Sequence, residues 1–310
     1  MTGLKDYIFA FSKLNVNRSG GHVSPHKPVM LLALLALAEA GQLKENKIYY
    51  TQDLRDIFKS FFQTVARPGD DCKPYYPFFH LKKDTFWHLK PVADREAVAE
   101  ALTTVRGPSQ ITDNFQYASL DDELFSLIMS APDREILKQT LIDRWFASCR
   151  EQIRTVAAEE LQIAVYETEL KEHKAAETRE DFSDRVRDAA FSRVVREAYD
   201  YRCAASGWRV ILPDGTVMVE AAHIIPFAES GDNDPCNGIA LEPNFHWALD
   251  RNILAPGPDL KWHVSSQLDK RNRDFQELLE LDKKPIILPR EKKYYPRMDG
   301  LELRISRLAV

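Results

Sequence analysis

Apolar residues recur at helical spacing through much of the first half of the chain. Leu4, Ile8, Phe9 and Phe11 give residues 1–14 an amphipathic stripe. The run 29–38 is apolar on every face and predicts a buried helix that begins near Pro25, since Pro is favoured in a first turn, and ends at a Gly. Further helical patterns cover residues 51–65, 120–129 and 132–146.

The pattern changes in the second half. Residues 151–181 are rich in Ala, Glu and Lys, contain neither Gly nor Pro, and predict a charged helical connector. An amphipathic helix is expected at 185–199. Two β-branched runs, 208–212 and 216–225, flank Pro213-Asp214-Gly215 and predict a β-hairpin. The remaining patterns predict a short helix from Pro243, a strand at 260–265, a short helix at 275–281 and terminal strand structure at 286–308.

These elements together predict an α+β chain of two domains. Residues 1–150 form a mostly helical domain with a few short strands, residues 151–182 the helical connector, and residues 183–310 the second domain. A chain of 310 residues is long enough for two hydrophobic cores. Aromatic residues and prolines are so dense between residues 73 and 87 that some of them are expected to line a surface pocket.

Charge and cysteine usage restrict the partners and the compartment. The formal net charge is −5, so a basic face for a polyanion has to be local. The longest apolar run falls below the ~18 residues of a membrane span, and the N-terminus lacks a cleavage pattern, which predicts a cytoplasmic protein without membrane association. The four cysteines, Cys72, Cys149, Cys203 and Cys236, form no C-x-x-C pair, which predicts reduced thiols and no structural zinc.

Three polar residues in the second half occur in a distinctive order. His223 leaves a predicted strand, Asn237 follows in a polar loop, and His246 lies on the helix that begins at Pro243, four residues before Asp250 and on the same helical face. This order of His, Asn and His resembles the ββα-metal site of HNH nucleases. The resemblance implies hydrolysis of phosphodiester bonds, with His223 as the general base, since a neutral imidazole is available near neutral pH.

The resemblance also implies a divalent ion, Mg²⁺ or Mn²⁺ in the first place, with other transition metals possible. His246 and Asp250 are the expected ligands, and Asn237 is expected to orient the base across the loop backbone. Many HNH enzymes carry a further ligand directly before the base, where this chain has Ala222. Either Asp250 replaces that ligand, or water and substrate complete the coordination. Strand alternation directs Glu220 away from the face of His223, which favours a structural role for Glu220.

The first domain carries a second set of motifs. His26-Lys27-Pro28 precedes the apolar helix, and Tyr76-Pro77-Phe78 is followed by Leu81, Asp84 and Trp87. These motifs resemble the sulfur-binding domain that is fused to HNH nucleases in McrA-like type IV restriction enzymes, which cut phosphorothioate DNA. Tyr76 and Pro77 match the pair that forms much of the family's sulfur pocket. Its small third residue is replaced here by His80 or the adjacent Phe79.

Basic residues near this pocket are candidate phosphate contacts, which position a domain on DNA without reading its sequence. They are Arg18, His26, Lys27, Arg67, Lys73 and Lys82. The alternative is that the aromatic residues belong to an ordinary core and the basic residues to a solvated rim.

The leading hypothesis is therefore a homodimeric endonuclease for phosphorothioate-modified double-stranded DNA that leaves 5'-phosphate and 3'-hydroxyl ends. A second hypothesis keeps the nuclease but directs it to modified bases or to unmodified DNA. A third, motivated by Ala222, is a non-cleaving DNA-binding or interaction module with a decayed HNH site. The sequence leaves open the DNA context around the modification and the distance to the cut.

Overall fold

The computed structural model describes residues 3–19, 22–174 and 181–309. The chain folds into two compact units. The first comprises Met1–Leu161 and Leu212–Thr216, and the second comprises Gln162–Ile211 and Val217–Val310. Helix α9 (Arg150–Lys171) begins in the first unit and ends in the second, so the predicted connector is helical as far as Lys171. Residues 175–180 of that prediction lie outside the described residues.

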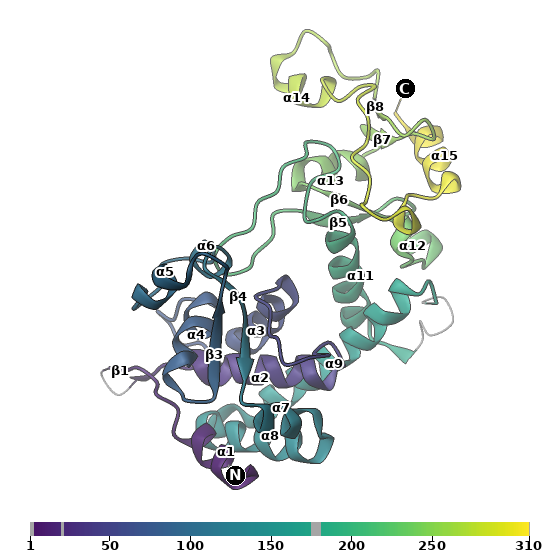
Figure 1. The fold of residues 1–310 in the computed structure, drawn as a ribbon. Coiled ribbons are helices and arrows are strands. Elements are labelled where there is room, and N and C mark those ends of the chain that lie inside the picture. Colours follow the sequence, from purple (N-terminus) through teal and green to yellow (C-terminus); the bar gives the residue numbers. More distant parts are fainter. Residues whose placement is uncertain (1–2, 20–21, 175–180, 310) are drawn as a thin grey trace. The chain divides into compact units, whose positions relative to one another are not determined.

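The core of the first unit is organised around helix α2 (His26–Glu39), which is buried along nearly its whole length because its apolar residues occupy every face. Other helices of the unit pack against it (Figure 1). No helix in the described part of the chain combines the length and the apolarity that crossing a membrane requires. The helices that pack against α2 are α3 (Gln52–Val65), α4 (Tyr75–His80), α7 (Asp122–Met129) and α8 (Ala131–Trp145), and α1 (Leu4–Ser12) packs against α7 and α8.

Two small antiparallel pairs of strands complete this unit. Strand β3 (Trp87–Pro91) pairs with β4 (Phe115–Leu120), and β1 (Arg18–Ser19) pairs with β2 (His22–Val23). Trp87 is buried, and its indole Nε1–H donates to the Phe78 carbonyl at 3.0 Å, which ties β3 to α4. The short helical elements are η1 (Leu81–Lys83), α5 (Glu96–Ala101), α6 (Ser109–Thr112) and η2 (Ala147–Cys149).

Helix α4 is the main element that the sequence patterns missed. Tyr75, Pro77, Phe78 and Phe79 are buried, whereas Tyr76 is 44% exposed. The aromatic residues were expected to divide between the core and the surface. They do so on one short helix, from which a single aromatic ring, that of Tyr76, faces outward. The sequence pattern did not predict this helix because two prolines within four residues usually argue against one. Pro74 and Pro77 both lie at its start, where the first turn tolerates proline.

The second unit contains the strands and helices that carry the HNH motif. Helix α11 (Asp184–Ala198) begins at Ser183, whose hydroxyl accepts from the Val186 amide, and packs against strands β5 (Glu220–His223) and β6 (Gly238–Leu241) (Figure 1). Helix α13 (Pro243–Asp250) follows β6. The other elements are α12 (Phe227–Ser230), η4 (Pro235–Asn237), β7 (Leu254–Pro256), β8 (Trp262–Val264), η5 (Arg273–Phe275), α14 (Gln276–Leu279), η6 (Lys292–Tyr294) and α15 (Met298–Arg307).

The predicted hairpin of residues 208–225 forms only next to its turn. The Leu212 and Met218 amides donate to the carbonyls of Thr216 and Val210 at 2.8 and 3.1 Å, on either side of the bridge between Ile211 and Val217. The later part of the second arm, strand β5, pairs instead with β6. Trp208, Val210 and Leu212 are exposed, so the β-branched run has no buried face on which a sheet could form.

The C-terminal prediction was also wrong, because residues 298–307 form helix α15 rather than a strand. Leu301 and Arg304, one helical turn apart, are its buried side chains. The preceding run from Ile286 to Leu288 is extended but forms no ladder among the described residues: the Ile286 and Ile287 amides donate singly to the carbonyls of Leu260 and Ala204.

Candidate functional site

The ββα unit of the second half consists of β5, β6 and α13. The antiparallel register sets Glu220 opposite Leu241 and His223 opposite Gly238. All four residues of β6 are buried. Because a fully buried strand of four residues shows no alternation, the sequence patterns gave no signal for it. His223 therefore ends β5, and Asn237 directly precedes the strand that pairs with it.

The ring of His223 is held between an aromatic ring and an amide. It stacks on Phe191 of α11, with the centroids 4.0 Å apart and an interplanar angle of 3°. Its Nε2–H donates to Oδ1 of Asn233 at 2.9 Å, which leaves the lone pair on Nδ1. Burial is the largest influence on the ring and lowers the pKa of His223 below its ordinary value of 6.5, so the ring is neutral at neutral pH.

Asn237 joins the two ends of the loop between β5 and β6. It is 2% exposed. Its Oδ1 accepts from the Ile225 amide at 2.8 Å, and its Nδ2 donates to the carbonyls of Ile225 and Asp232 at 3.0 Å. Through these three bonds to the backbone of Ile225 and Asp232, Asn237 fixes the path of the chain directly after His223 and transfers no proton.

His246 lies between two carboxylates. Its Nδ1–H donates to Oε2 of Glu220 at 2.7 Å, and its Nε2 is 3.6 Å from Oδ2 of Asp250. Glu220 therefore fixes the tautomer that leaves the Nε2 lone pair on the side of Asp250. Strand alternation predicted a structural role for Glu220, but its carboxylate contacts His246, which comes from helix α13 and not from strand β5.

The pair of His246 Nε2 and Asp250 Oδ2 fits a divalent ion. Two ligands of one ion, each about 2.1 Å from it, are roughly 3.0 to 3.4 Å apart, close to the observed 3.6 Å. Among the smaller influences on His223, the neighbouring His246 also lowers its pKa. The protein supplies two donors here, which leaves the other coordination positions to water and substrate.

Arg304 of α15 supports the backbone at this site and escaped the sequence analysis. It is 3% exposed. Its guanidinium donates to the carbonyls of His223 at 3.0 Å and Leu249 at 3.2 Å, and also to that of Ile224. It thus ties the end of β5 to the end of α13. No sequence signal could identify it, because its segment was expected to be a strand. Asn233, which holds the ring of His223, was also missed.

A cavity of about 460 Å³ opens on the first unit. Six of the residues predicted for DNA or sulfur binding line it, together with five others that were not predicted. The predicted residues are Arg18, His26, Lys27, Tyr76, Pro77 and His80, and the others are Asn15, Val16, Asn17, Ser24 and Lys83.

Tyr76 and His80 form the aromatic wall of this cavity. Their ring centroids are 4.4 Å apart, as expected for residues one turn apart on α4. Burial lowers the pKa of His80 to about 4, and the nearby Lys83, Lys27 and Lys82 contribute to the shift. The wall is therefore uncharged at neutral pH.

His26 and Lys27 shape the cavity floor. The Lys27 ammonium forms a buried ion pair with Asp84, whose other oxygen accepts from the Asn15 amide at 2.8 Å. His26 accepts from the Ser24 hydroxyl and donates to the Asp71 carbonyl, each at 2.9 Å. Burial lowers the pKa of both side chains. Their polar atoms are already engaged, so Arg18 and Lys83 are the cations that the cavity offers to a phosphate.

The other predicted residues lie elsewhere. Phe79 is wholly buried, and Lys73 pairs with Asp71 at 2.8 Å. The Lys82 ammonium donates to the Leu102 carbonyl at 2.9 Å and lies 3.8 Å from the centre of the Phe79 ring. Arg67 lines a neighbouring cavity of about 200 Å³ that also includes Arg18. Of the two residues predicted for the third position of the pocket, His80 lines the cavity and Phe79 does not.

Comparison with known proteins gives both units a family. Residues 5–152 match the ScoMcrA-like DNA sulfur-binding domain, and residues 203–255 match the HNH endonuclease family. The chain is therefore a nuclease in which a DNA-binding domain precedes an HNH domain. More particularly, the matched sulfur-binding domain lies at the N-terminus and the matched HNH domain at the C-terminus.

Two solved structures show more distant likeness. One is the modification-dependent TagI restriction endonuclease, with 21% identity, a TM-score of 0.29, and coverage of 38% of this chain and 37% of that one. The other is the sulfur-binding domain of SprMcrA complexed with phosphorothioated DNA, with 15% identity, a TM-score of 0.38, and coverage of 50% and 93%. Both TM-scores are low, so the assignment depends on the two family matches. None of the curated proteins matches the chain.

Proposed function

We propose that this protein binds phosphorothioate-modified double-stranded DNA through the cavity of its first unit and hydrolyses a phosphodiester bond at the HNH site of its second. The observation that carries the proposal is the composition of the cavity. A neutral wall of Tyr76, Pro77 and His80 faces a space that also contains the cations Arg18 and Lys83.

This composition suits sulfur better than oxygen. A non-bridging sulfur is larger and more easily desolvated than an oxygen, so an apolar aromatic wall favours it. An ordinary phosphate oxygen would lose its water at the same wall without gaining donors. Arg18 and Lys83 then neutralise phosphate charge whether the DNA is modified or not, which gives affinity but not discrimination.

Hydrolysis follows from the positions of His223, Asn237 and His246. Nδ1 of His223 takes a proton from water, while Asn233 and Phe191 hold the ring in place. Asn237 keeps the loop closed behind the base. His246 and Asp250 would hold the divalent ion, which supplies Lewis-acid stabilisation of charge on the phosphate and on the leaving oxygen. The expected products carry 5'-phosphate and 3'-hydroxyl ends.

One such site cuts one strand, so a double-strand break needs two. We propose that a homodimer supplies the second site, since symmetric dimers are the commonest oligomers. The rate of double-strand cleavage per protein molecule tests the dimer. If this rate stays constant as protein concentration varies over the range where the chain is a monomer, the dimer is excluded.

The deciding experiment compares two duplexes that are identical except for one phosphorothioate, at matched salt. We expect the sulfur duplex to bind more tightly, and Tyr76→Ala to weaken that preference by roughly thirtyfold, or about 2 kcal/mol, because it removes a central aromatic contact. Tyr49→Ala is the matched control, because Tyr49 is 47% exposed and does not line the cavity. Equal binding of both duplexes would refute sulfur recognition.

A cleavage assay distinguishes an active nuclease from a binding module with a decayed HNH site. Cutting with Mg²⁺ or Mn²⁺ should disappear in His223→Ala while binding of the sulfur duplex remains. Should the unaltered protein bind but never cut, the chain is a non-cleaving binding module. A preference for DNA with a modified base over the sulfur duplex would instead support the second hypothesis, in which the cavity admits an extruded nucleotide.

A further inference from the structure

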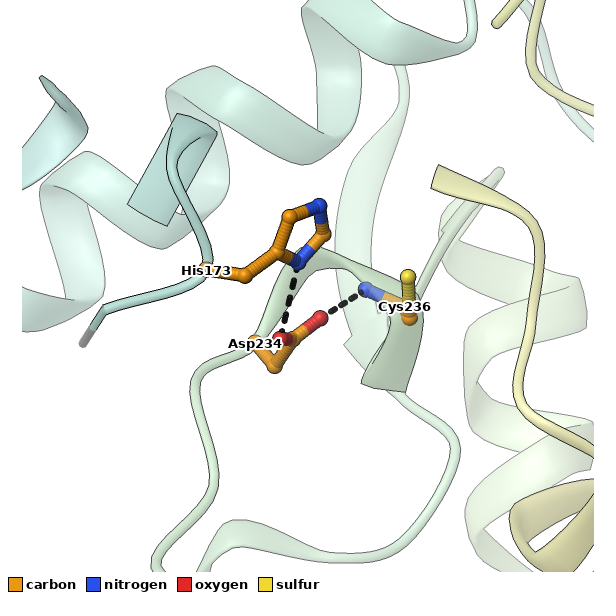
Figure 2. A group of neighbouring side chains, drawn as sticks. All are labelled: His173, Asp234 and Cys236. Carbon is orange, nitrogen blue, oxygen red and sulfur yellow. Dashed lines mark hydrogen bonds and ion pairs between the residues drawn. The ribbon is translucent and has the colours of Figure 1, made fainter. Parts of the chain in front are cut away.

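A second cluster of possible metal ligands lies in the second unit, away from His246 and Asp250. It consists of His173, just past the end of α9, and Asp234 and Cys236 from the loop between β5 and β6 (Figure 2). Nδ1 of His173 is 2.9 Å from Oδ2 of Asp234, and one ligand atom from each residue lies within 4.8 Å of the others. No other set of three such residues is this close within the described ranges 3–19, 22–174 and 181–309.

The donor set has a specific chemistry. A thiolate, an imidazole and a carboxylate together suit Zn²⁺ or Co²⁺, whereas Mg²⁺ prefers oxygen ligands. Ligands of one tetrahedral ion are roughly 3.3 to 3.8 Å apart for bond lengths of about 2.0 to 2.3 Å. The ligand atoms, which lie within 4.8 Å of one another, would move closer by up to about 1 Å to reach this spacing around an ion. We propose that His173, Asp234 and Cys236 bind a structural zinc ion, with water as the fourth ligand.

The position of the cluster indicates what the ion would stabilise. Asp234 and Cys236 lie between Asn233, which bonds to the His223 ring, and Asn237, which closes the loop. Asp234 also accepts from the Cys236 amide at 2.8 Å. An ion bound there would hold the loop residues that orient the proposed base. This last consequence depends on the proposed function, but the metal site itself does not.

The same ion would also join the end of helix α9 to the loop, because His173 follows the last turn of that helix. The Cys236 thiol donates to the Lys293 carbonyl at 3.0 Å, and a metal-bound thiolate would give up this hydrogen bond with its proton. The His173 ring is 6.1 Å from the Tyr294 ring. A tightly bound ion stabilises a folded chain in this way, because the unfolded chain lacks the preformed ligand geometry.

This proposal departs from the sequence expectation of no structural zinc. That expectation depended on the absence of C-x-x-C pairs. His173 and Asp234 are separated by 61 positions along the chain, and the D-x-C pair in the loop is too short and too common to indicate a metal. Only folding brings the three residues together.

Cobalt is the most informative probe. The metal-free protein, prepared with a chelator, is titrated with Co²⁺, and the near-ultraviolet absorption is recorded. We expect a thiolate-to-cobalt charge-transfer band, because a sulfur ligand is present. Cys236→Ser should abolish the band, and His173→Gln should weaken Co²⁺ binding at least tenfold. The HNH site lacks a cysteine and cannot produce this band, so His246→Ala should retain it.

Cys149→Ser is the matched control for thiol chemistry, because Cys149 lies outside the cluster. It should retain the band. Metal analysis after gel filtration with Zn²⁺ should show one bound ion fewer in Cys236→Ser than in the unaltered protein. A metal-free protein that gives no band with Co²⁺, or a band that survives in Cys236→Ser, would overturn the proposal. Neither result depends on DNA cleavage.

Discussion

At the scale of single residues, Phe191 and Asn233 hold the ring of His223, the proposed proton acceptor, in one orientation. His223 is neutral because burial against Phe191 disfavours its charged form, and its Nε2–H is fixed by a neutral amide. Burial lowers the pKa of His223 by more than the hydrogen bond to Asn233 raises it, so the amide orients the ring while the net shift stays downward. A carboxylate in the same place would orient it equally well but would hold the proton that the reaction has to pass on.

This difference predicts a pH dependence. Because the pKa of His223 lies below 6.5, the acid limb of kcat/KM should have its midpoint below pH 6.5. The rate should fall as pH drops through the pKa, since the protonated ring accepts no further proton. In Asn233→Asp the midpoint should rise by about 1 unit or more, because an adjacent negative charge favours the protonated ring. Plots of kcat/KM against pH for both proteins test this prediction. An unchanged midpoint in Asn233→Asp would show that Asn233 does not influence the pKa of His223.

The contact between Glu220 and His246 carries the second prediction. Replacing Glu220 with Gln keeps the shape but loses the charge that fixes the tautomer of His246, and such changes typically cost 10- to 100-fold in metal affinity or activity. The concentration of Mg²⁺ that gives half-maximal cleavage should rise accordingly. Glu229→Gln is the control, because it removes a carboxylate from the exposed pair with Arg307. If both variants lose activity equally, the loss comes from the change in net charge and not from the contact between Glu220 and His246.

At the scale of elements, the backbone of strand β6 at Gly238 lies directly against side chains of helix α11. A Cβ atom added at Gly238 would lie 2.3 Å from Cγ2 of Val195 and 3.0 Å from Cζ of Phe191, both on α11. Phe191 is also the ring on which His223 stacks. The absence of a side chain at Gly238 thus allows the helix to support the base.

Gly238→Ala should therefore affect stability and catalysis together. Overpacking of this kind costs about 1 to 3 kcal/mol of unfolding free energy. Displacement of the Phe191 ring should lower kcat by roughly tenfold, because small errors in position are costly for proton transfer. Urea denaturation and steady-state cleavage measure the two effects. Gly107→Ala is the comparison, since an added Cβ there meets nothing within 4 Å. Full activity in Gly238→Ala would show that the stack is not needed.

The elements also show what the sequence could and could not reveal. Helix α2 was predictable because its apolar run is continuous, and His223, Asn237 and His246 because three chemical types occurred in a known order. Strand β6 is too short for a periodic signal. Glu220, Asn233 and Arg304 act through contacts with residues distant in the chain, and only tertiary structure reveals such contacts. His80 was predicted by position, but its neutrality follows from burial that no local pattern specifies.

At the scale of the whole molecule, a chain with a net charge of −5 has to bind a polyanion through a few local cations. The cavity of the first unit offers Arg18 and Lys83, with Arg67 in the adjacent cavity, while Lys27 is neutralised by Asp84. Each phosphate contact contributes about −0.9 to the slope of log K against log salt concentration. Two or three contacts give a slope between about −2 and −3, which is shallow for a DNA-binding protein.

This charge arrangement makes the sulfur preference and the salt dependence separable. Arg18→Ala should reduce the magnitude of the slope by about 1 for the sulfur duplex and the plain duplex alike, because it removes one phosphate contact and leaves the aromatic wall in place. The ratio of the two affinities should stay the same. Lys44→Ala, an exposed cation outside the cavity, should change neither quantity. A large change in the affinity ratio in Arg18→Ala would mean that charge, and not the neutral wall of Tyr76, Pro77 and His80, distinguishes sulfur from oxygen.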